Sequence, residues 1–152
     1  MRRSLCTRKA TPMSDAIEHE IKLAAPPADC LRALTSTDAL RAWYTPDTDG
    51  DAAAGGTIRF QFDHAPTFRW QVLDAGPTTV RWRCIEGPGD SVGTEAVFTL
   101  SATADGRTLV ELAHAGWPNR AGNFRKCNTL WGHLLGRLQN YVQTGVAAPA
   151  LA

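Results

Sequence analysis

Five segments between Thr57 and His114 alternate apolar with polar residues, and this alternation restricts the possible folds more than any other feature. A period of two places every apolar side chain of a strand on one face. Turn-forming residues separate the segments at 64–66, 74–77, 86–90 and 105–106. Five strands joined by short turns predict an antiparallel meander with one apolar face and one face in water.

A long helical pattern runs from about Arg120 to Thr144. Its apolar residues recur every third or fourth position and form one stripe: Phe124, Cys127, Trp131, Leu134, Leu135, Leu138 and Val142. Gly145 is expected to end this helix. Because the sheet face and the stripe both need burial, the helix is predicted to lie across the sheet. We interpret Gly132 and Gly136, on its flank, as positions of close packing within the chain.

The segment before the meander predicts one strand and two short helices. Residues 17–23 alternate like a half-buried strand, and Pro26 and Pro27 end it. Residues 27–36 have helical spacing, and Thr37 or Asp38 is expected to cap a second short helix. Residues 50–56 are typical of a loop. The predicted fold class is therefore α+β, with a six-stranded antiparallel sheet, two short helices after the first strand and one long C-terminal helix.

Three groups of residues occur in a specific order along the chain. They are Ile21-x-Leu23-x-Ala25-Pro26 with Leu31-x-Ala33-Leu34-Thr35 and Leu40-x-x-Trp43; Gly106-x-Thr108-x-Val110-x-Leu112-x-His114-x-Gly116-Trp117; and Phe124-x-x-Cys127-x-x-x-Trp131-x-x-Leu134-x-x-x-Leu138-x-x-Tyr141-x-x-x-Gly145. Together they resemble the SRPBCC, or START-like, helix-grip superfamily, above all the group related to the C-terminal domain of the heat-shock-protein-90 ATPase activator. The resemblance spans about residues 17–149 and implies a curved sheet wrapped around the helix.

The resemblance also implies a cavity between sheet and helix, and the strand and helix patterns suggest its lining. The expected lining residues are Trp43, Phe60, Trp70, Trp82, Cys84, Phe98, His114, Trp117, Phe124, Cys127 and Trp131. Trp43 and Trp117 lie near loops, where the resemblance suggests a portal. Mostly apolar, aromatic pockets are the usual sites of small molecules, although the same residues equally suit a packed core.

No recognisable catalytic constellation occurs in the sequence. His114 shares the apolar face of the last strand and is a weak candidate for a general acid or base; the alternative is a core histidine satisfied by hydrogen bonds. Cys127 is interpreted as a buried thiol rather than a reactive one. The scattered histidines and cysteines predict no metal site, and no cofactor is expected.

Three functions agree with these patterns. The first is binding of a small hydrophobic ligand, lipid-like or aromatic, in the expected cavity. The second is a cyclase- or dehydratase-type enzyme acting on a polyketide-like substrate held there. The third is a protein interaction module similar to the chaperone-ATPase activators, because the resemblance implies one fold and several functions. A homodimer or another protein partner is compatible with each.

Composition narrows the partners and the compartment. Sixteen basic and fifteen acidic residues give a net charge of +1, which does not favour nucleic acid, and no apolar run is long enough for a membrane span. The four cysteines form no C-x-x-C pair, which favours free thiols and a cytoplasmic location. Residues 1–13 are interpreted as a disordered leader or a misplaced start, 14–146 as the domain and 147–152 as a disordered tail.

Overall fold

The computed structural model describes residues 15–147, so the interpretation of 1–13 and of nearly all of the tail lies outside the described residues. The strands are β1 (Asp15–Leu23), β2 (Asp47–Gly50), β3 (Thr57–Gln61), β4 (Thr67–Ala75), β5 (Thr79–Glu86), β6 (Glu95–Ala102) and β7 (Thr108–Trp117). The helices are α2 (Pro27–Thr35), α3 (Thr37–Trp43) and α4 (Asn123–Thr144), with a 3-10 turn η1 at Gly89–Ser91. The α+β class, the two short helices and the long C-terminal helix are confirmed.

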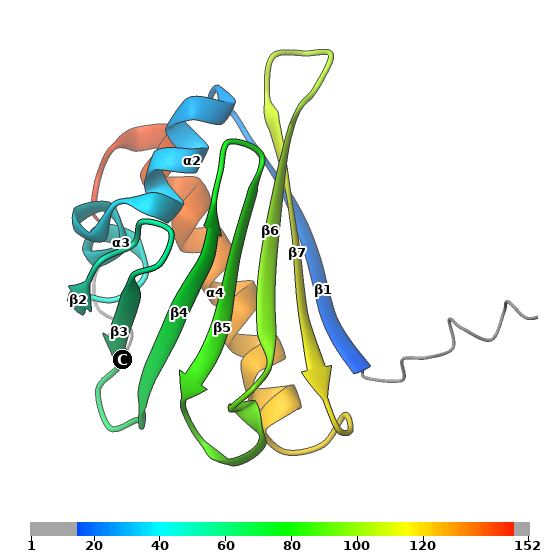
Figure 1. Cartoon of the computed structure of the whole chain (residues 1–152). Coiled ribbons are helices and arrows are strands. Elements are labelled where there is room, and N and C mark those ends of the chain that lie inside the picture. The colour runs from blue at the N-terminus through cyan, green and yellow to red at the C-terminus, as the bar shows by residue number, and fades with distance from the viewer. Residues whose placement is uncertain (1–14, 148–152) are drawn as a thin grey trace, which may run out of the picture.

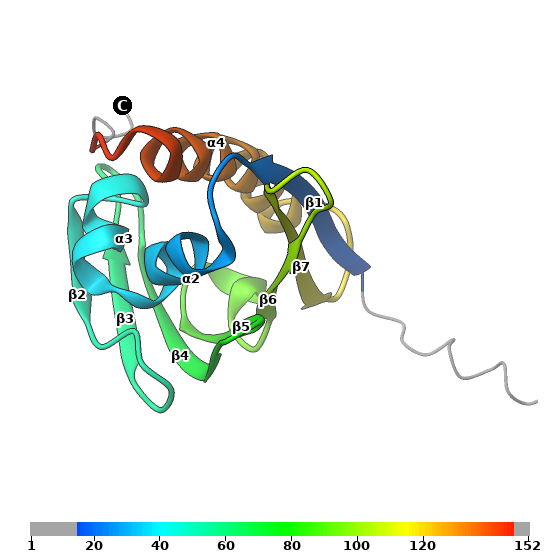
Figure 2. The same cartoon turned by 90° about the horizontal axis from the view of Figure 1, so that it is seen from above.

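All strands pair antiparallel in one sheet, in the order β1-β7-β6-β5-β4-β3-β2. Figure 1 shows α4 crossing behind this sheet, and in Figure 2 the sheet curves so that α4 lies along its open side, with α2 and α3 closing one end. The β3–β4 and β5–β6 connections and the start of α4 meet at the opposite end (Figure 1). The molecule therefore has one end closed by helices and one end formed by loops.

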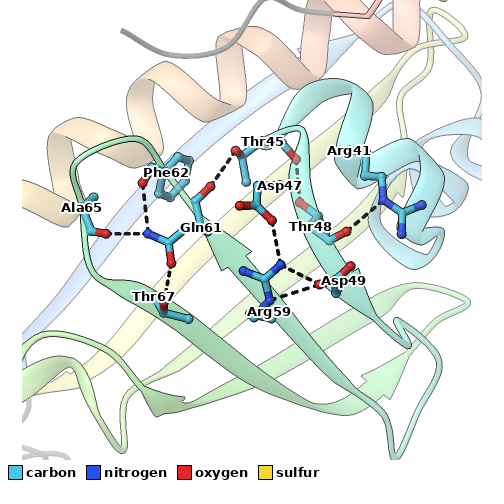
Figure 3. A network of polar contacts seen from close by, with 10 residues as sticks. All are labelled: Arg41, Thr45, Asp47, Thr48, Asp49, Arg59, Gln61, Phe62, Ala65 and Thr67. Carbon is cyan, nitrogen blue, oxygen red and sulfur yellow. Dashed lines mark hydrogen bonds and ion pairs between the residues drawn. The ribbon is translucent and has the colours of Figure 1, made fainter.

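The sheet has seven strands, one more than the sequence predicts. The extra strand, β2, has the sequence DTDG and therefore no apolar alternation. Its single buried residue is Thr48. Ion pairs stabilise it instead: Arg59 of β3 donates to Asp47 and to Asp49, each at 2.6 Å (Figure 3). A strand stabilised by charges across its ladder gives no period-two hydrophobic signal.

The two short helices differ from expectation only in the cap between them. Ser36, rather than Thr37 or Asp38, caps α3: its hydroxyl accepts the backbone N–H of Ala39 at 3.3 Å. The Thr37 hydroxyl instead donates to the carbonyl of Gly50 at 3.1 Å and so connects α3 to the end of β2. Three consecutive candidate caps, Ser, Thr and Asp, offer the same chemistry, and tertiary contacts select among them.

The apolar stripe of α4 faces the sheet as predicted. Its residues from Phe124 to Leu138 are buried, and Gly145 ends the helix in the left-handed conformation, donating its N–H to the carbonyl of Tyr141 at 2.7 Å. The interpretation of Gly132 and Gly136 is wrong, because both are exposed and a Cβ added at either meets nothing within 4 Å. They lie on the solvent-exposed face of α4, whose opposite face packs against the sheet.

Helix α4 also covers the free edge of β1. The side-chain amide of Gln139 donates to the carbonyl of Lys22 at 3.0 Å, and that of Gln143 accepts the N–H of Ala24 at 2.8 Å. His19 pairs with the Asn128 amide oxygen at 2.9 Å. The two glutamine contacts occupy backbone groups that an exposed edge strand leaves open to other strands.

The interior between sheet and helix is tightly filled. Phe60, Trp70, Trp82 and Phe98 point inward as predicted, and each is at most 2% exposed. The ring of Tyr44, which follows α3, stacks on Phe60 with centroids 3.8 Å apart. A small central void, lined by Trp70, His114 and Trp131 among others, measures about 10 Å³, roughly the space of one water molecule. Around these side chains the structure shows close packing, and within residues 15–147 no roomy cavity is seen there.

Candidate functional site

A chain of hydrogen bonds around His114 links α4, β7 and the β5–β6 connection. The indole N–H of Trp131 donates to Nδ1 of His114 at 2.9 Å, and Nε2 of His114 lies 2.7 Å from the Thr94 hydroxyl. The same hydroxyl donates to the carbonyl of Ser91 at 2.6 Å. Because an indole nitrogen only donates, Nδ1 carries no proton, so Nε2 carries it and donates to Thr94.

Both ring nitrogens of His114 are thus used inside the protein. Burial lowers the pKa of His114 to about 3, which keeps the imidazole neutral at physiological pH. Neither nitrogen is free to exchange a proton with a bound molecule in this arrangement. The geometry supports the alternative considered from sequence, a core histidine satisfied by its hydrogen bonds.

An open groove of about 480 Å³ lies at the loop end of the molecule. The β3–β4 turn forms one wall with Phe62, Ala65, Pro66 and the start of β4, and the first half of α4 forms the other. Pro88, from the β5–β6 connection, closes one side. The volume lies within the range of small-molecule pockets, about 300–1,000 Å³.

Polar side chains surround the mouth of this groove. Asp63 lies on the turn, and Asn123, Lys126 and His133 lie along α4. Lys126 and His133 are exposed, whereas Asn123 is partly buried and donates to the carbonyl of Pro88 at 3.2 Å. The groove therefore combines an apolar floor with a small number of polar groups at its edge, which is the usual composition of a small-molecule site.

Gln61 shapes the turn that forms the groove wall. Its side-chain amide donates to the carbonyls of Phe62 at 3.1 Å and Ala65 at 2.6 Å, and its amide oxygen accepts from the Thr67 hydroxyl (Figure 3). The backbone carbonyl of Gln61 accepts from Thr45 at 3.0 Å. One side chain thus bonds to three positions in and beside the turn, which holds the wall in a defined position.

Three side chains separate the groove from the central void. Phe68, Cys127 and Leu130 line both spaces, while Tyr44, Trp70, His114 and Trp131 line the void alone. Leu130 is only partly buried. Burial raises the pKa of the Cys127 thiol to about 12, so the thiol stays protonated and is a poor nucleophile. The wall is therefore apolar and chemically inert.

The residues expected to line a cavity take three different positions. Cys127 lines the groove, and Trp70, His114, Cys127 and Trp131 line the void. The others pack in the core: Trp43, Phe60, Trp82, Cys84, Phe98, Trp117 and Phe124. Trp43 and Trp117 are at most 1% exposed, and the Trp43 indole donates to the carbonyl of Ala33 at 2.8 Å, so neither lies at an opening.

Most residues that line the groove were not predicted from the sequence. Phe62 and Phe68 belong to the expected apolar face of the sheet. Because they lie beside the β3–β4 turn, they line the groove at the loop end of the molecule rather than the centre of the sheet. Lys126 and His133 lie on the polar side of the helix pattern and resemble ordinary solvent-exposed residues. Pro66 and Pro88 indicate in the sequence that turns occur at these positions. They do not indicate that the two turns lie close together in space.

A second hollow, of about 470 Å³, lies on the outer face of the sheet over β1, β7 and β6. Its charged residues are Glu18, Glu20 and Glu111, and none of them forms an ion pair within residues 15–147. Glu20 and Glu111 face each other directly across the two strands. Three carboxylates without ion-pair partners favour hydration, so this hollow is a poor site for an apolar molecule.

Residues 15–147 contain no group of three or more His, Cys, Asp or Glu placed to hold a metal ion. Cys30, Cys84 and Cys127 are buried free thiols. No helix among the described residues has the length and apolar content to cross a membrane.

The curved antiparallel sheet around a C-terminal helix, with a groove at its loop end, defines a helix-grip protein of the SRPBCC class. The match to a known family is more specific. Residues 24–143 match the family described as activator of Hsp90 ATPase homolog 1-like protein, and the chain belongs to that family. No curated protein sequence matches the chain significantly.

Solved structures agree with this assignment. The chain is 30% identical to the Aha1 dimer of Colwellia psychrerythraea, with a TM-score of 0.77 over 86% of this chain and 98% of that one. CalU16 of Micromonospora echinospora is 20% identical, with a TM-score of 0.71 over 90% and 78%. DynU16, a putative protein of the dynemicin biosynthetic locus, is 22% identical, with a TM-score of 0.71 over 88% and 49%. The last two show the fold alone.

Proposed function

We propose that this protein binds a small hydrophobic molecule in the groove between the β3–β4 turn and α4. The observation that carries the proposal is the groove itself: about 480 Å³, open to solvent, with an apolar floor and polar groups at its mouth. The small central void, at about 10 Å³, is too small for such a molecule. Both volumes support a binding site at the loop end rather than at the centre.

A fluorescent probe tests the proposal. 1-Anilinonaphthalene-8-sulfonate is aromatic, fits a pocket of this size and carries an anionic group that suits Lys126 at the mouth. It is expected to bind the native protein one-to-one. Leu130→Trp fills the groove from α4 and should weaken binding by about tenfold or more, which corresponds to about 1.4 kcal/mol.

A matched control uses the neighbouring residue. Thr129 is exposed and does not line the groove, so Thr129→Trp adds the same side chain to the same helix outside the site. It should change probe affinity by less than about twofold, as surface changes usually have small effects. Equal affinity of wild type and Leu130→Trp would refute the groove as the binding site.

A second candidate is a protein interaction module, which the family and the Aha1 neighbour favour. Ile85, near the end of β5, and Val92, in the β5–β6 connection, are large apolar residues that are 44% and 51% exposed. The test is the ATPase rate of a purified Hsp90 chaperone with and without this chain. An increase that Val92→Asp abolishes would support this function, and an unchanged rate would leave ligand binding as the proposed function.

The same neighbour motivates a proposal of homodimerisation, since that relative is a dimer. Light scattering during size-exclusion chromatography measures the mass of the assembly directly. A mass near twice 16.4 kDa at micromolar concentration would support a dimer, and a mass near 16.4 kDa would contradict it.

A further inference from the structure

The buried side-chain polar atoms that lack a partner in residues 15–147 are all hydrogen-bond donors. Among the described residues they are Nε1 of Trp70, Trp82 and Trp117 and Nη2 of Arg137. No buried side-chain acceptor is without a partner there. Buried donors without acceptors are unfavourable, and native proteins contain few of them. A molecule that brings an acceptor into this interior therefore gains a hydrogen bond that the protein cannot make by itself.

Of the four residues with an unpartnered donor, Trp70 is the one that lines the central void. It is 2% exposed, and the groove meets this void at Phe68, Cys127 and Leu130. Trp82 and Trp117 line neither space. Trp131 lines the void too, but its indole already donates to His114. The void, at about 10 Å³, has room for about one small atom such as an oxygen.

The chemistry of the void decides which oxygen suits it. Its lining includes no Lys or Arg, and the nearest cation of the groove, Lys126, is exposed at the mouth. An ionised carboxylate would lose its hydration there without a counter-charge. Burial raises the pKa of Tyr44, which also lines the void, well above its usual value, so its phenol stays a donor. A neutral acceptor fits these surroundings.

We infer that the ligand of the groove is an apolar carbonyl compound, a ketone or ester, whose carbonyl oxygen enters the void and accepts the indole N–H of Trp70. This inference rests on the proposed function, because it assumes that the groove binds a hydrophobic molecule. The body of the ligand lies between the β3–β4 turn and α4, and its oxygen passes Leu130. Charged groups of the ligand, where present, stay at the mouth beside Lys126 and His133.

Two naphthalenes of matched shape test the inference. 2-Acetylnaphthalene carries the carbonyl, and 2-ethylnaphthalene has a methylene group in its place. Without a hydrogen bond, the ethyl compound should bind more tightly, because it is the more hydrophobic of the two. We expect the opposite: the acetyl compound binds about fivefold more tightly, because its oxygen gains a donor. 2-Naphthoate, which carries a charge, should bind more weakly than the acetyl compound.

Indole N–H resonances of the ¹⁵N-labelled protein report on the atom involved. The acetyl compound should move the Trp70 indole proton downfield, and the ethyl compound should not. Trp43 provides an internal control in the same spectrum, since its N–H already donates to Ala33. Trp70→Phe should abolish the preference for the acetyl compound, whereas Trp82→Phe, which removes an unpartnered donor outside the void, should keep it.

The outcomes separate this inference from the proposed function. If neither naphthalene binds, the groove proposal and the inference both fail. If both bind and the ethyl compound is equal or tighter, with no shift at Trp70, the groove proposal stands and the carbonyl assignment is overturned. If Trp70→Phe does not fold, the wild-type affinities and the Trp70 resonance still decide the matter.

Discussion

The indole nitrogen of Trp131 lies 2.9 Å from Nδ1 of His114, and this hydrogen bond joins the middle of α4 to β7 inside the core. Trp131 is also packed edge-on against Phe98, with ring centroids 5.6 Å apart. A directional bond between two buried groups allows one position of the helix along the sheet, whereas apolar contacts alone tolerate several. The pair therefore sets how α4 lies on the sheet and, with it, where the groove wall stands.

Trp131→Phe should destabilise the protein more than Trp82→Phe. Both indoles are buried, so the two changes remove similar volume, but Trp131 donates to His114 while the Trp82 nitrogen has no partner. Losing the first leaves the buried Nδ1 of His114 without a donor, at a cost of about 1–2 kcal/mol beyond the volume effect. Urea unfolding of the two variants measures the difference, and equal losses would contradict the role of the bond.

Stability should fall with acid because of His114. Its pKa is about 3 in the folded protein and about 6.5 when unfolded, so between these values the unfolded chain binds one proton more. The free energy of unfolding should therefore decrease by about 1.4 kcal/mol for each pH unit below about 6.5. The loss attributable to this residue is about 2 kcal/mol between pH 7 and pH 5.

His114→Gln provides the comparison for this pH effect. Glutamine has no titratable proton, yet it offers one acceptor to Trp131 and one donor to Thr94. Urea unfolding at pH 7, 6 and 5 should show a shallower decline for this variant than for wild type. The exposed His133→Asn is the matched control, and it should keep the wild-type slope. Parallel curves for His114→Gln and wild type would refute the argument.

Gly132→Ala and Gly136→Ala should each stabilise the protein by about 0.5–1 kcal/mol. Both sites are exposed within α4 and a Cβ meets nothing within 4 Å, so alanine gains helix propensity at no steric cost. Thermal unfolding measures the gain. Gly145→Ala is the opposite control, because its φ of +74° disfavours a side chain and should cost about 1–2 kcal/mol.

Cys84→Phe should destabilise the protein rather than fill an empty site. Cys84 is 1% exposed on β5, and a Cβ placed on Gly87 would already lie 3.2 Å from its sulfur. Overpacking of this kind costs about 1–3 kcal/mol. Chemical unfolding beside the milder Cys84→Ala measures it. A Cys84→Phe variant as stable as wild type would show that the interior has room that the structure does not describe.

Gln61→Ala should weaken binding in the groove, because it frees the turn that carries Phe62 and Ala65. We expect a loss of about fivefold in affinity for 1-anilinonaphthalene-8-sulfonate and of about 1–2 kcal/mol in stability. Gln71→Ala, in β4 and without side-chain hydrogen bonds in the described structure, is the control. Unchanged affinity in Gln61→Ala would show that the turn holds its position by other contacts.

The amino-acid sequence by itself determined the type and order of most elements and which residues point inward. Period-two alternation put Phe60 and Trp82 on the inner face, and the helical stripe put Trp131 against them, because burial follows these periods directly. Strand β2 was not predicted, because its sequence DTDG contains no apolar residue. It pairs with β3 through ion pairs to Arg59 instead. The cap at Ser36 was not predicted either, because Ser36, Thr37 and Asp38 are all residues that can cap a helix.

Only the tertiary structure decided where space remains. The same aromatic residues suit a cavity or a packed core, and the choice depends on how closely their rings approach, as Tyr44 does on Phe60. The groove forms where the turn around Pro66, the connection at Pro88 and the first half of α4 converge, three segments far apart in the chain. Periodicity describes which way a residue faces within one element, whereas a site between elements depends on their mutual distances, which no local pattern contains.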